Sequence, residues 1–401
     1  MIRKIIHLDL DAFFCAVEEL RDPSLAGKPF AVGGRPESRG VVSSCSYASR
    51  SLGIHSAMPM AQAVRLCPGL IIVSPRHHIY SEVSDQVMER MRSLTPLVEQ
   101  ISIDEAFLDV SDLPEPGEVI ARHLQEKIRD ELGLPCSLGV ATNKLLAKTA
   151  TDIGKAAAHG GGPPNAITIV PPGEEAAFLA PLPVQALWGI GPKTAERLRS
   201  IGVLCIGDLA RLSEAELTNL FGKNGRDLSI RARGFDDRPV ITEHEIKSIS
   251  QETTFARDVR DEKVLRRTIQ DLSENVGRRL RDSSISATTV RLKIRWPDFT
   301  TLTRQMTLSH PTDKDSVLFT SATQLFNKVW KSGRAIRLIG VGVSGLGASI
   351  RQLTFWDEKQ EQKETRLLEA VDHLRRRFGE ETLHRGSQID PSHQTGEDGN
   401  L

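Results

Sequence analysis

The sequence lacks any apolar run near the ~18 residues that a membrane-spanning helix requires. Its beginning, MIRKIIHLDLD, carries carboxylates where a signal peptide needs a continued apolar stretch and small residues for cleavage. The absence of both features predicts a cytoplasmic protein that has no association with a membrane.

Cysteine is scarce, with five residues scattered among 401 and no Cys-x-x-Cys pair. An odd number without metal-ligand spacing argues against both a disulfide framework and a zinc site. We expect reduced thiols inside the folded protein at Cys15, Cys45, Cys67, Cys136 and Cys205.

Net charge is absent too, because 52 Lys and Arg balance 52 Asp and Glu. The balance is uneven along the chain: residues 247–351 hold 19 cations against 10 anions, and residues 352–401 hold 7 against 11. A basic segment favours contact with nucleic-acid phosphates. The length predicts about two to four domains.

The first 170 residues alternate between strand and helix patterns. An apolar, β-branched strand at 3–9 leads into a helix at 12–20, and a small insert follows with strands at 30–32 and 41–44 and a helix at 59–66. The remaining elements are a helix at 76–94, extended runs at 98–103 and 106–110, a helix at 118–132, a strand at 137–141, a helix from 143 and a strand at 166–170. This order is the split βαβ arrangement.

The second half changes character twice. Residues 171–234 are helical and rich in glycine, and the polar segment 236–245 has linker composition. Four strands and two helices then follow between 248 and 342. Alternation along 289–295 places apolar side chains on one strand face and three cations on the other, namely Arg291, Lys293 and Arg295. These cations could contact DNA, or they could lie on a solvated outer face. The local positive charge favours DNA contact.

Three acids carry the chemistry. Asp9 ends a buried strand, and Asp104 with Glu105 lies at the tip of a hairpin that this fold places beside that strand. Converging carboxylates need a cation, and their hard oxygens suit Mg²⁺ bound to substrate phosphates. A two-metal site follows, in which one ion activates a hydroxyl and the other stabilises departing pyrophosphate. The alternative is that these acids are ordinary turn residues. The joint placement of all three in a split βαβ fold argues against it.

Five segments occur in the order and spacing of a known family, the Y-family translesion DNA polymerases, which the chain resembles over residues 1–356. They are HLDLDAFF from His7, SYASR from Ser46, SIDEAF from Ser102, NKLLAK from Asn143 and WGIGP from Trp188. The resemblance implies an α+β right-hand polymerase in several domains. These are a split βαβ (ferredoxin-like) palm at 1–10 and 76–170, small fingers at 11–75, a helical thumb with a helix-hairpin-helix at 171–235, a linker at 236–246, a βαββαβ little finger at 247–351 and a tail at 352–401.

The resemblance also implies roles at the site. Asp9, Asp104, Glu105 and the Leu10 backbone carbonyl would hold two Mg²⁺ ions per active site, with Mn²⁺ as an alternative. Phe14 would be the steric gate that excludes a ribose 2′-hydroxyl, although a Phe at a helix start is otherwise ordinary core.

The incoming deoxynucleoside triphosphate would be bound by Ser44, Tyr47, Arg50 and Lys155. A guanidinium and an ammonium match phosphate oxygens, which supports this interpretation independently. The family's usual Lys-Pro-x-Gly is replaced here by KAAAHGGG from Lys155, so the register of that lysine stays open.

Two further motifs point to partners. Gly189 and Gly191 before a helix resemble a hairpin whose backbone N–H groups bind DNA phosphates, with Lys193 as an added contact. A peptide resembling a sliding-clamp ligand consists of Gln352, Leu353, Phe355 and Trp356, and the alternative is packing on its own domain. A helix at 366–378 has no assigned role, residues 375–377 are interpreted as a solvated face, and the composition from 387 is that of disorder.

Together these features predict a monomeric, low-fidelity and low-processivity DNA-directed DNA polymerase. It would add deoxynucleotides to the 3′-hydroxyl of primer-template DNA with a sliding clamp as partner. The alternatives are a nucleotidyl cyclase, against which the basic domain and thumb hairpin speak, and an inactive DNA-binding scaffold, which would be expected to lose the acids.

Overall fold

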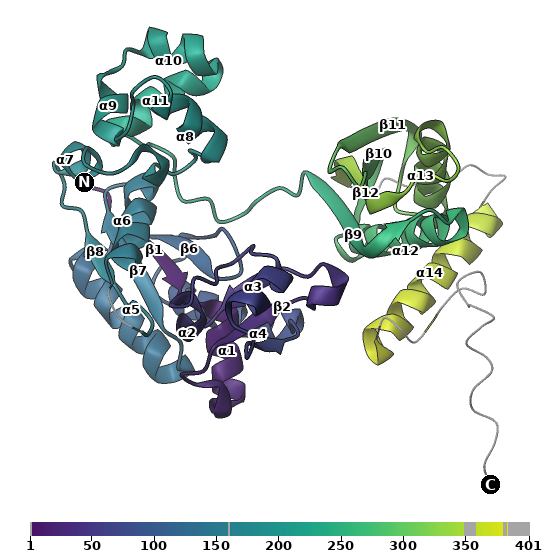
Figure 1. Cartoon of the computed structure of the whole chain (residues 1–401), viewed down its shortest axis with the longest axis horizontal. Coiled ribbons are helices and arrows are strands. Elements are labelled where there is room, and N and C mark those ends of the chain that lie inside the picture. Colours follow the sequence, from purple (N-terminus) through teal and green to yellow (C-terminus); the bar gives the residue numbers. More distant parts are fainter. Residues whose placement is uncertain (1, 159–160, 349–357, 380–382, 384–401) are drawn as a thin grey trace. The chain divides into compact units, whose positions relative to one another are not determined.

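A computed structural model describes residues 2–158, 161–348, 358–379 and 383, and the chain divides into two compact units, Met1–His244 and Glu245–Leu401. Both units mix helices and sheets (Figure 1), so the predicted α+β multidomain class is confirmed. None of the helices in the described ranges is long and apolar enough to span a membrane. All five cysteines are free thiols.

A five-stranded sheet in the order β5-β6-β1-β7-β8 organises the first unit. Its strands are β1 (Ile5–Leu10), β5 (Val98–Gln100), β6 (Glu105–Asp109), β7 (Cys136–Ala141) and β8 (Ile167–Ile169). The connecting helices are α4 (His77–Arg92), α5 (Gly117–Leu132) and α6 (Lys144–Ala157). Strand β1 runs antiparallel to β6 and β7, and α6 crosses over to add the parallel strand β8. The predicted split βαβ order is present.

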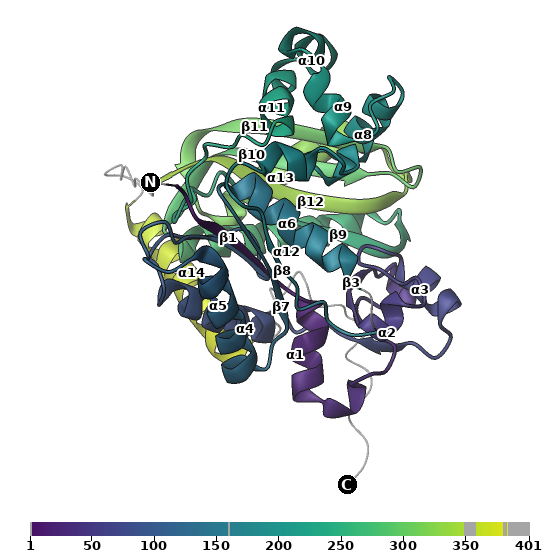
Figure 2. The same cartoon turned by 90° about the vertical axis from the view of Figure 1, so that its left-hand side faces the viewer.

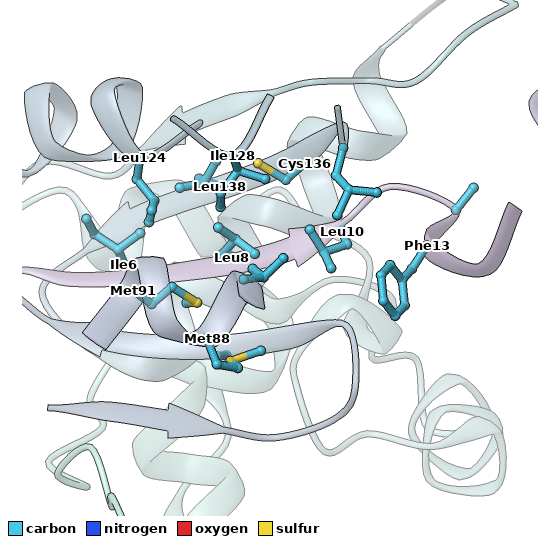
Figure 3. Packing of buried hydrophobic residues seen from close by; sticks show 14 of the residues in the cluster. Ile6, Leu8, Leu10, Phe13, Met88, Met91, Leu124, Ile128, Cys136 and Leu138 are labelled. Carbon is cyan, nitrogen blue, oxygen red and sulfur yellow. The ribbon is translucent and has the colours of Figure 1, made fainter. Parts of the chain in front are cut away.

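Strand β1 separates two different environments. Ile6, Leu8 and Leu10 are buried in the core that also contains residues of α4 and α5 (Figure 3). Side chains alternate along a strand, so His7 and Asp9 point to the opposite face. Helix α6 packs against β1 and β7 on that face, and Figure 2 looks onto this helix.

The insert after β1 begins with Ala12 in the left-handed backbone region, at φ 48°, where the strand turns into a helix. Its elements are α1 (Phe13–Arg21), β2 (Phe30–Gly33), β3 (Val42–Cys45), α2 (Tyr47–Arg50), α3 (Met60–Leu66), β4 (Ile71–Val73) and two 3₁₀ turns at 23–25 and 36–38. Strand β4 was not predicted, because a three-residue apolar run carries no periodicity.

The helical segment that follows has five α-helices and one 3₁₀ turn at 184–186. The helices are α7 (Glu175–Leu179), α8 (Pro192–Arg199), α9 (Ile206–Arg211), α10 (Glu214–Phe221) and α11 (Lys223–Ala232). It is tied to the start of α6, because Asn143 donates to the Gly234 carbonyl and the Leu145 amide donates to Asp236. The polar segment predicted as linker is therefore docked at its beginning.

The second unit is a four-stranded antiparallel sheet in the order β11-β10-β12-β9, with a βαββαβ order of elements as predicted. Its elements are β9 (Ser248–Val259), α12 (Glu262–Asp282), β10 (Ile285–Arg295), β11 (Thr301–Thr312), α13 (Asp315–Val329) and β12 (Ile336–Ala348). Alternation in β10 is also as predicted. Val290, Leu292 and Ile294 are buried, whereas the three cations are at least partly exposed.

Helix α14 (Glu358–Phe378) completes the second unit and begins earlier than predicted. The solvated face expected at 375–377 is wrong for Arg375, whose side chain is 11% exposed and pairs with Glu274 at 3.1 Å. Asp372 likewise pairs with Arg281 at 2.6 Å, because α14 lies against α12. The clamp-like peptide at 352–356 and the disorder predicted from 387 lie outside the described residues.

Candidate active site

The end of β1 brings the three predicted acids together. Asp9 stands directly opposite Glu105 in the ladder between β1 and β6. The Leu10 amide donates to the Asp104 carbonyl at 2.9 Å, which places the hairpin tip beside the same strand end. The Ser102 hydroxyl donates to the Asp104 carboxylate at 2.5 Å and orients it. The backbone positions of the three acids are therefore adjacent at one end of β1.

Helix α6 presents a row of polar side chains to these acids. The Lys148 ammonium donates to Glu105 Oε2 at 2.5 Å, and the Lys155 ammonium donates to Asp9 Oδ1 at 2.6 Å and lies 3.1 Å from Asp11 Oδ1. Asp11 is buried and accepts two further bonds from the Ser137 hydroxyl. The sequence left open whether Lys155 reaches the site. In the structure its ammonium lies beside Asp9.

The charged groups at this end of β1 shift one another's pKa values. Contact with His7, aided by Lys148, holds the pKa of Glu105 at about 2 although burial opposes the shift. Burial raises the pKa of Asp9, and Lys155 only partly offsets it. Burial alone would lower the pKa of Lys155, but Asp9 and Asp11 outweigh that effect and raise it. Lys155 therefore stays charged and stabilises carboxylates that like charges would otherwise repel.

A cavity of about 330 Å³ opens at the same place. Its lining includes seven of the predicted site residues, namely Asp9, Leu10, Phe14, Ser44, Arg50, Asp104 and Lys155. Glu105 is not among the lining residues. Tyr47 lines a neighbouring cavity, with the Arg50 guanidinium 4.9 Å from its ring centre. Among the residues that the structure describes, the buried Tyr47 hydroxyl has no hydrogen-bond partner.

Phe14 is fixed against the cavity wall. Its ring stacks on Tyr80 at a centroid distance of 4.3 Å and an interplanar angle of 14°. Tyr80 is fully buried, and its hydroxyl donates to Glu18 at 2.6 Å. A partly exposed ring held in this way cannot swing aside without breaking the stacking arrangement.

The oxygen donors fit a divalent metal in chemistry. Carboxylate and carbonyl oxygens are the ligands that Mg²⁺ prefers. As they stand, no three His, Cys, Asp or Glu side chains in the described ranges are arranged to hold an ion. Asp9 and Glu105 are instead each bound to a lysine through one oxygen, and each keeps its other oxygen for a ligand.

The predicted DNA contacts come from elements that do not line the cavity of the acids. Gly189 adopts φ 97°, and Gly191 caps α8 while Lys193 is exposed and Ile190 anchors the hairpin inward. On the outer face of the second sheet, three cations of β10 bond to residues of other strands: Arg291 to Gln305, Lys293 to Glu252 and Arg295 to Thr301.

Sequence analysis assigned no role to several residues that the structure brings to the site. Lys148 and Thr151 face β1 from α6 together with the predicted Lys155, and Thr151 contacts His7. Their spacing of three and four residues is the signal of one helix face. Asp11 has no comparable signal, because its partners Ser137 and Asn165 lie far along the chain.

Comparison with known proteins defines the family. Residues 8–152 match the impB/mucB/samB family, residues 246–355 match the C-terminal domain of that family, and residues 172–203 match the IMS family HHH motif. A solved Y-family DNA polymerase chimera, Dbh-Dpo4(243-245)-Dbh, superimposes with a TM-score of 0.77 at 26% identity, covering 86% of this chain and 100% of its own.

Curated relatives are named DNA polymerase IV. That of Desulfatibacillum aliphaticivorans is 40% identical over 94% of this chain and 95% of its own length. That of Streptomyces coelicolor is 43% identical over 85% of this chain and 71% of its own, and that of Clostridioides difficile is 38% identical over 93% and 98%.

The chain therefore belongs to the impB/mucB/samB family of Y-family DNA polymerases. It is a DNA-directed DNA polymerase that uses DNA and nucleotides and needs divalent metal ions. Within the family it groups with the DNA polymerase IV type, whose activity is translesion synthesis. These relatives do not favour the cyclase or the inactive scaffold.

Proposed function

We propose that the chain extends a primer by two-metal nucleotidyl transfer, with two Mg²⁺ ions held by Asp9, Asp104, Glu105 and the Leu10 carbonyl, and with Mn²⁺ as a substitute. The supporting observation is the pairing of Asp9 with Glu105 beside the Asp104 carbonyl. When bound, the two ions would lower the pKa of the primer hydroxyl and neutralise the charge that develops on pyrophosphate.

Four side chains bind and orient the triphosphate in this proposal: Ser44, Tyr47, Arg50 and Lys155. The buried Tyr47 hydroxyl supports it, since a buried donor without a partner costs about 1–3 kcal/mol and a phosphate oxygen would relieve that cost. The guanidinium of Arg50 and the ammonium of Lys155 line the cavity of the acids and supply positive charge there.

Phe14 is proposed as the steric gate, because its ring lines the cavity and is held by Tyr80. Phe14→Ala should reduce discrimination against ribonucleotides by on the order of 10²-fold. Separate extension assays with deoxy- and ribonucleotides measure this ratio. An unchanged ratio in a folded variant would reject the gate.

The predicted domains are proposed as palm (1–10 and 76–170), fingers (11–75), thumb (171–235), linker (236–246) and little finger (247–351). The thumb hairpin would bind DNA phosphates through Gly189, Gly191 and Lys193. The little finger would bind them through the outer face of its sheet, namely Arg291, Lys293 and Arg295. Partly exposed cations on this face support the second contact.

A sliding clamp is proposed as partner on the peptide pattern alone, through Gln352, Leu353, Phe355 and Trp356 of the tail at 352–401. We propose a monomer, since polymerisation on one primer end needs one site, and a cytoplasmic location, where bacterial DNA and its clamp are found.

Primer extension tests the central proposal. Asp104→Ala should lose extension while primer-template binding is retained, because the acid acts on metal and not on DNA. Asp112→Ala, a carboxylate a few residues beyond the end of β6, is the matched control and should extend normally. Full extension by Asp104→Ala would end the proposal.

A further inference from the structure

Glu105 is bound on one side only. Lys148 Nζ lies 2.5 Å from Oε2, and His7 Nε2 lies 3.3 Å from the same oxygen. Within the described residues, Oε1 receives no hydrogen bond. Both donors therefore converge on Oε2, and the second oxygen of this carboxylate is left for another ligand.

His7 is an unusual neighbour for a carboxylate, because it is fully buried beneath α6. A ring nitrogen that carries a hydrogen donates and one that carries a lone pair accepts, so the neighbours of each nitrogen define its role. Nδ1 of His7 lies 3.0 Å from the Thr151 hydroxyl, and its ring centre lies 4.8 Å from that of Phe107. The ring is thus held from two sides.

Glu105 determines whether Nε2 of His7 carries a hydrogen. A lone pair on Nε2 would face the Glu105 carboxylate and be repelled by it, whereas an N–H there is attracted. A hydrogen therefore belongs on Nε2. The Thr151 hydroxyl also lies 3.1 Å from the Ala147 carbonyl and 3.3 Å from the His7 carbonyl, so it can donate to Nδ1 or accept from it. Nε2 has no partner at a full hydrogen-bond angle in the described part of the chain, and Glu105 is the acidic group beside it. Aligning the two would satisfy a buried donor.

We propose that His7 is a positioning residue for the reaction: its Nε2–H holds Oε2 of Glu105 and directs Oε1 toward the metal, and Thr151 holds the ring through Nδ1. This inference rests on the proposed role of Glu105 as a metal ligand. The His7 ring is suited to this task, because it is fully buried and held between Thr151 and Phe107, so the direction of its Nε2 is fixed.

The outer partners of metal ligands change metal affinity by roughly 10–100-fold when they are removed. His7→Leu should therefore weaken binding of Mn²⁺ by about 10-fold or more, and raise the Mg²⁺ concentration for half-maximal extension by the same factor. His7→Gln keeps an N–H donor and should recover most of the loss. Thr151→Val, which removes the contact at Nδ1 and loosens the ring, should weaken binding in the same direction by less.

The test measures Mn²⁺ binding to the full chain by electron paramagnetic resonance, without nucleotide, and metal-dependent extension separately. His78→Leu, an exposed histidine, is the matched control. A purely structural role would lower the melting temperature and leave Mn²⁺ affinity unchanged, which would overturn the inference. If His7→Leu does not fold, Thr151→Val decides alone.

Glu105→Gln separates this inference from the proposed function. If Glu105→Gln keeps full Mn²⁺ affinity, Glu105 is not a ligand and the proposed function fails with the inference. If Glu105→Gln weakens binding but His7→Leu and Thr151→Val do not, only the positioning role of His7 is rejected.

Discussion

The two faces of the five-stranded sheet differ in polarity, and strand β1 contributes side chains to both. On one face, Ile6, Leu8 and Leu10 are buried among apolar side chains. On the other, His7 and Asp9 meet a polar helix face. Because strand side chains alternate, a slip of one residue in register would exchange the two sets. The apolar face therefore fixes the position of the acids as well as stabilising the fold.

Helix α6 covers the polar face. Burial of the charged side chains there is tolerated because cations and anions form ion pairs. Lys144 pairs with Glu99 at 2.7 Å, with both side chains less than 10% exposed, and lysines also meet Glu105 and Asp9. Burying a charge is costly unless it is paired. The second sheet solves the problem differently, because its cationic face is left partly exposed.

Asp9→Asn tests the polar face and should have the largest effect. The amide keeps the shape and removes a charge that a metal would need, so extension should fall by at least about 10³-fold. Stability should change little, because the raised pKa of Asp9 means that burial already disfavours its charge. Steady-state extension and denaturant unfolding measure the two quantities. Retained extension would contradict a catalytic role for the polar face of the sheet.

Leu8→Ala tests the apolar face one residue away. The side chain is fully buried, so the free energy of unfolding should fall by about 2–5 kcal/mol. Extension per folded molecule should fall far less than in Asp9→Asn. Denaturant titration followed by extension at saturating metal checks this pair. Loss of extension without loss of stability would show that the faces are not separable.

Asp315 asks how a buried charge outside the active site behaves. Burial raises its pKa to about 6 despite its bond with Arg281. The folded pKa exceeds the unfolded value of 3.8, so protonation stabilises the fold, and that stability is lost as pH rises from about 4 through 6. The loss in the second unit should be about 2–3 kcal/mol.

Unfolding of the full chain between pH 4 and 7 measures this slope, and Asp315→Asn should flatten it. A slope that is unchanged in the variant would assign the effect to another group in the cluster.

The exposed cations should give the smallest effect. Replacing Arg291, Lys293 and Arg295 by Ala should lower the slope of log affinity against log salt by roughly 0.9 for each phosphate that is no longer neutralised. Filter binding of primer-template DNA at several salt concentrations measures it. The control replaces three cations of α12, on the covered side of the sheet, namely Lys263, Arg267 and Arg279, and should leave the slope unchanged.

Local patterns accounted for much of the fold. The strand at β1, the hairpin acids and the alternation in β10 follow from periods of two, and the long helices follow from periods near 3.6. Strand β4 was too short to show a period. The prediction for Arg375 was wrong because its partner Glu274 lies 101 residues away, and no local pattern specifies such a pair.

The sequence by itself determined the family, the three acids and the face of each strand on which they lie, since these depend on residue identity and local period. Only the tertiary structure decided their partners. Lys155 and Asp9 are separated by 146 residues, and His7 and Thr151 by 144. Such pairs form because packing of the apolar face sets where α6 crosses the sheet, and chain order carries no information about that position.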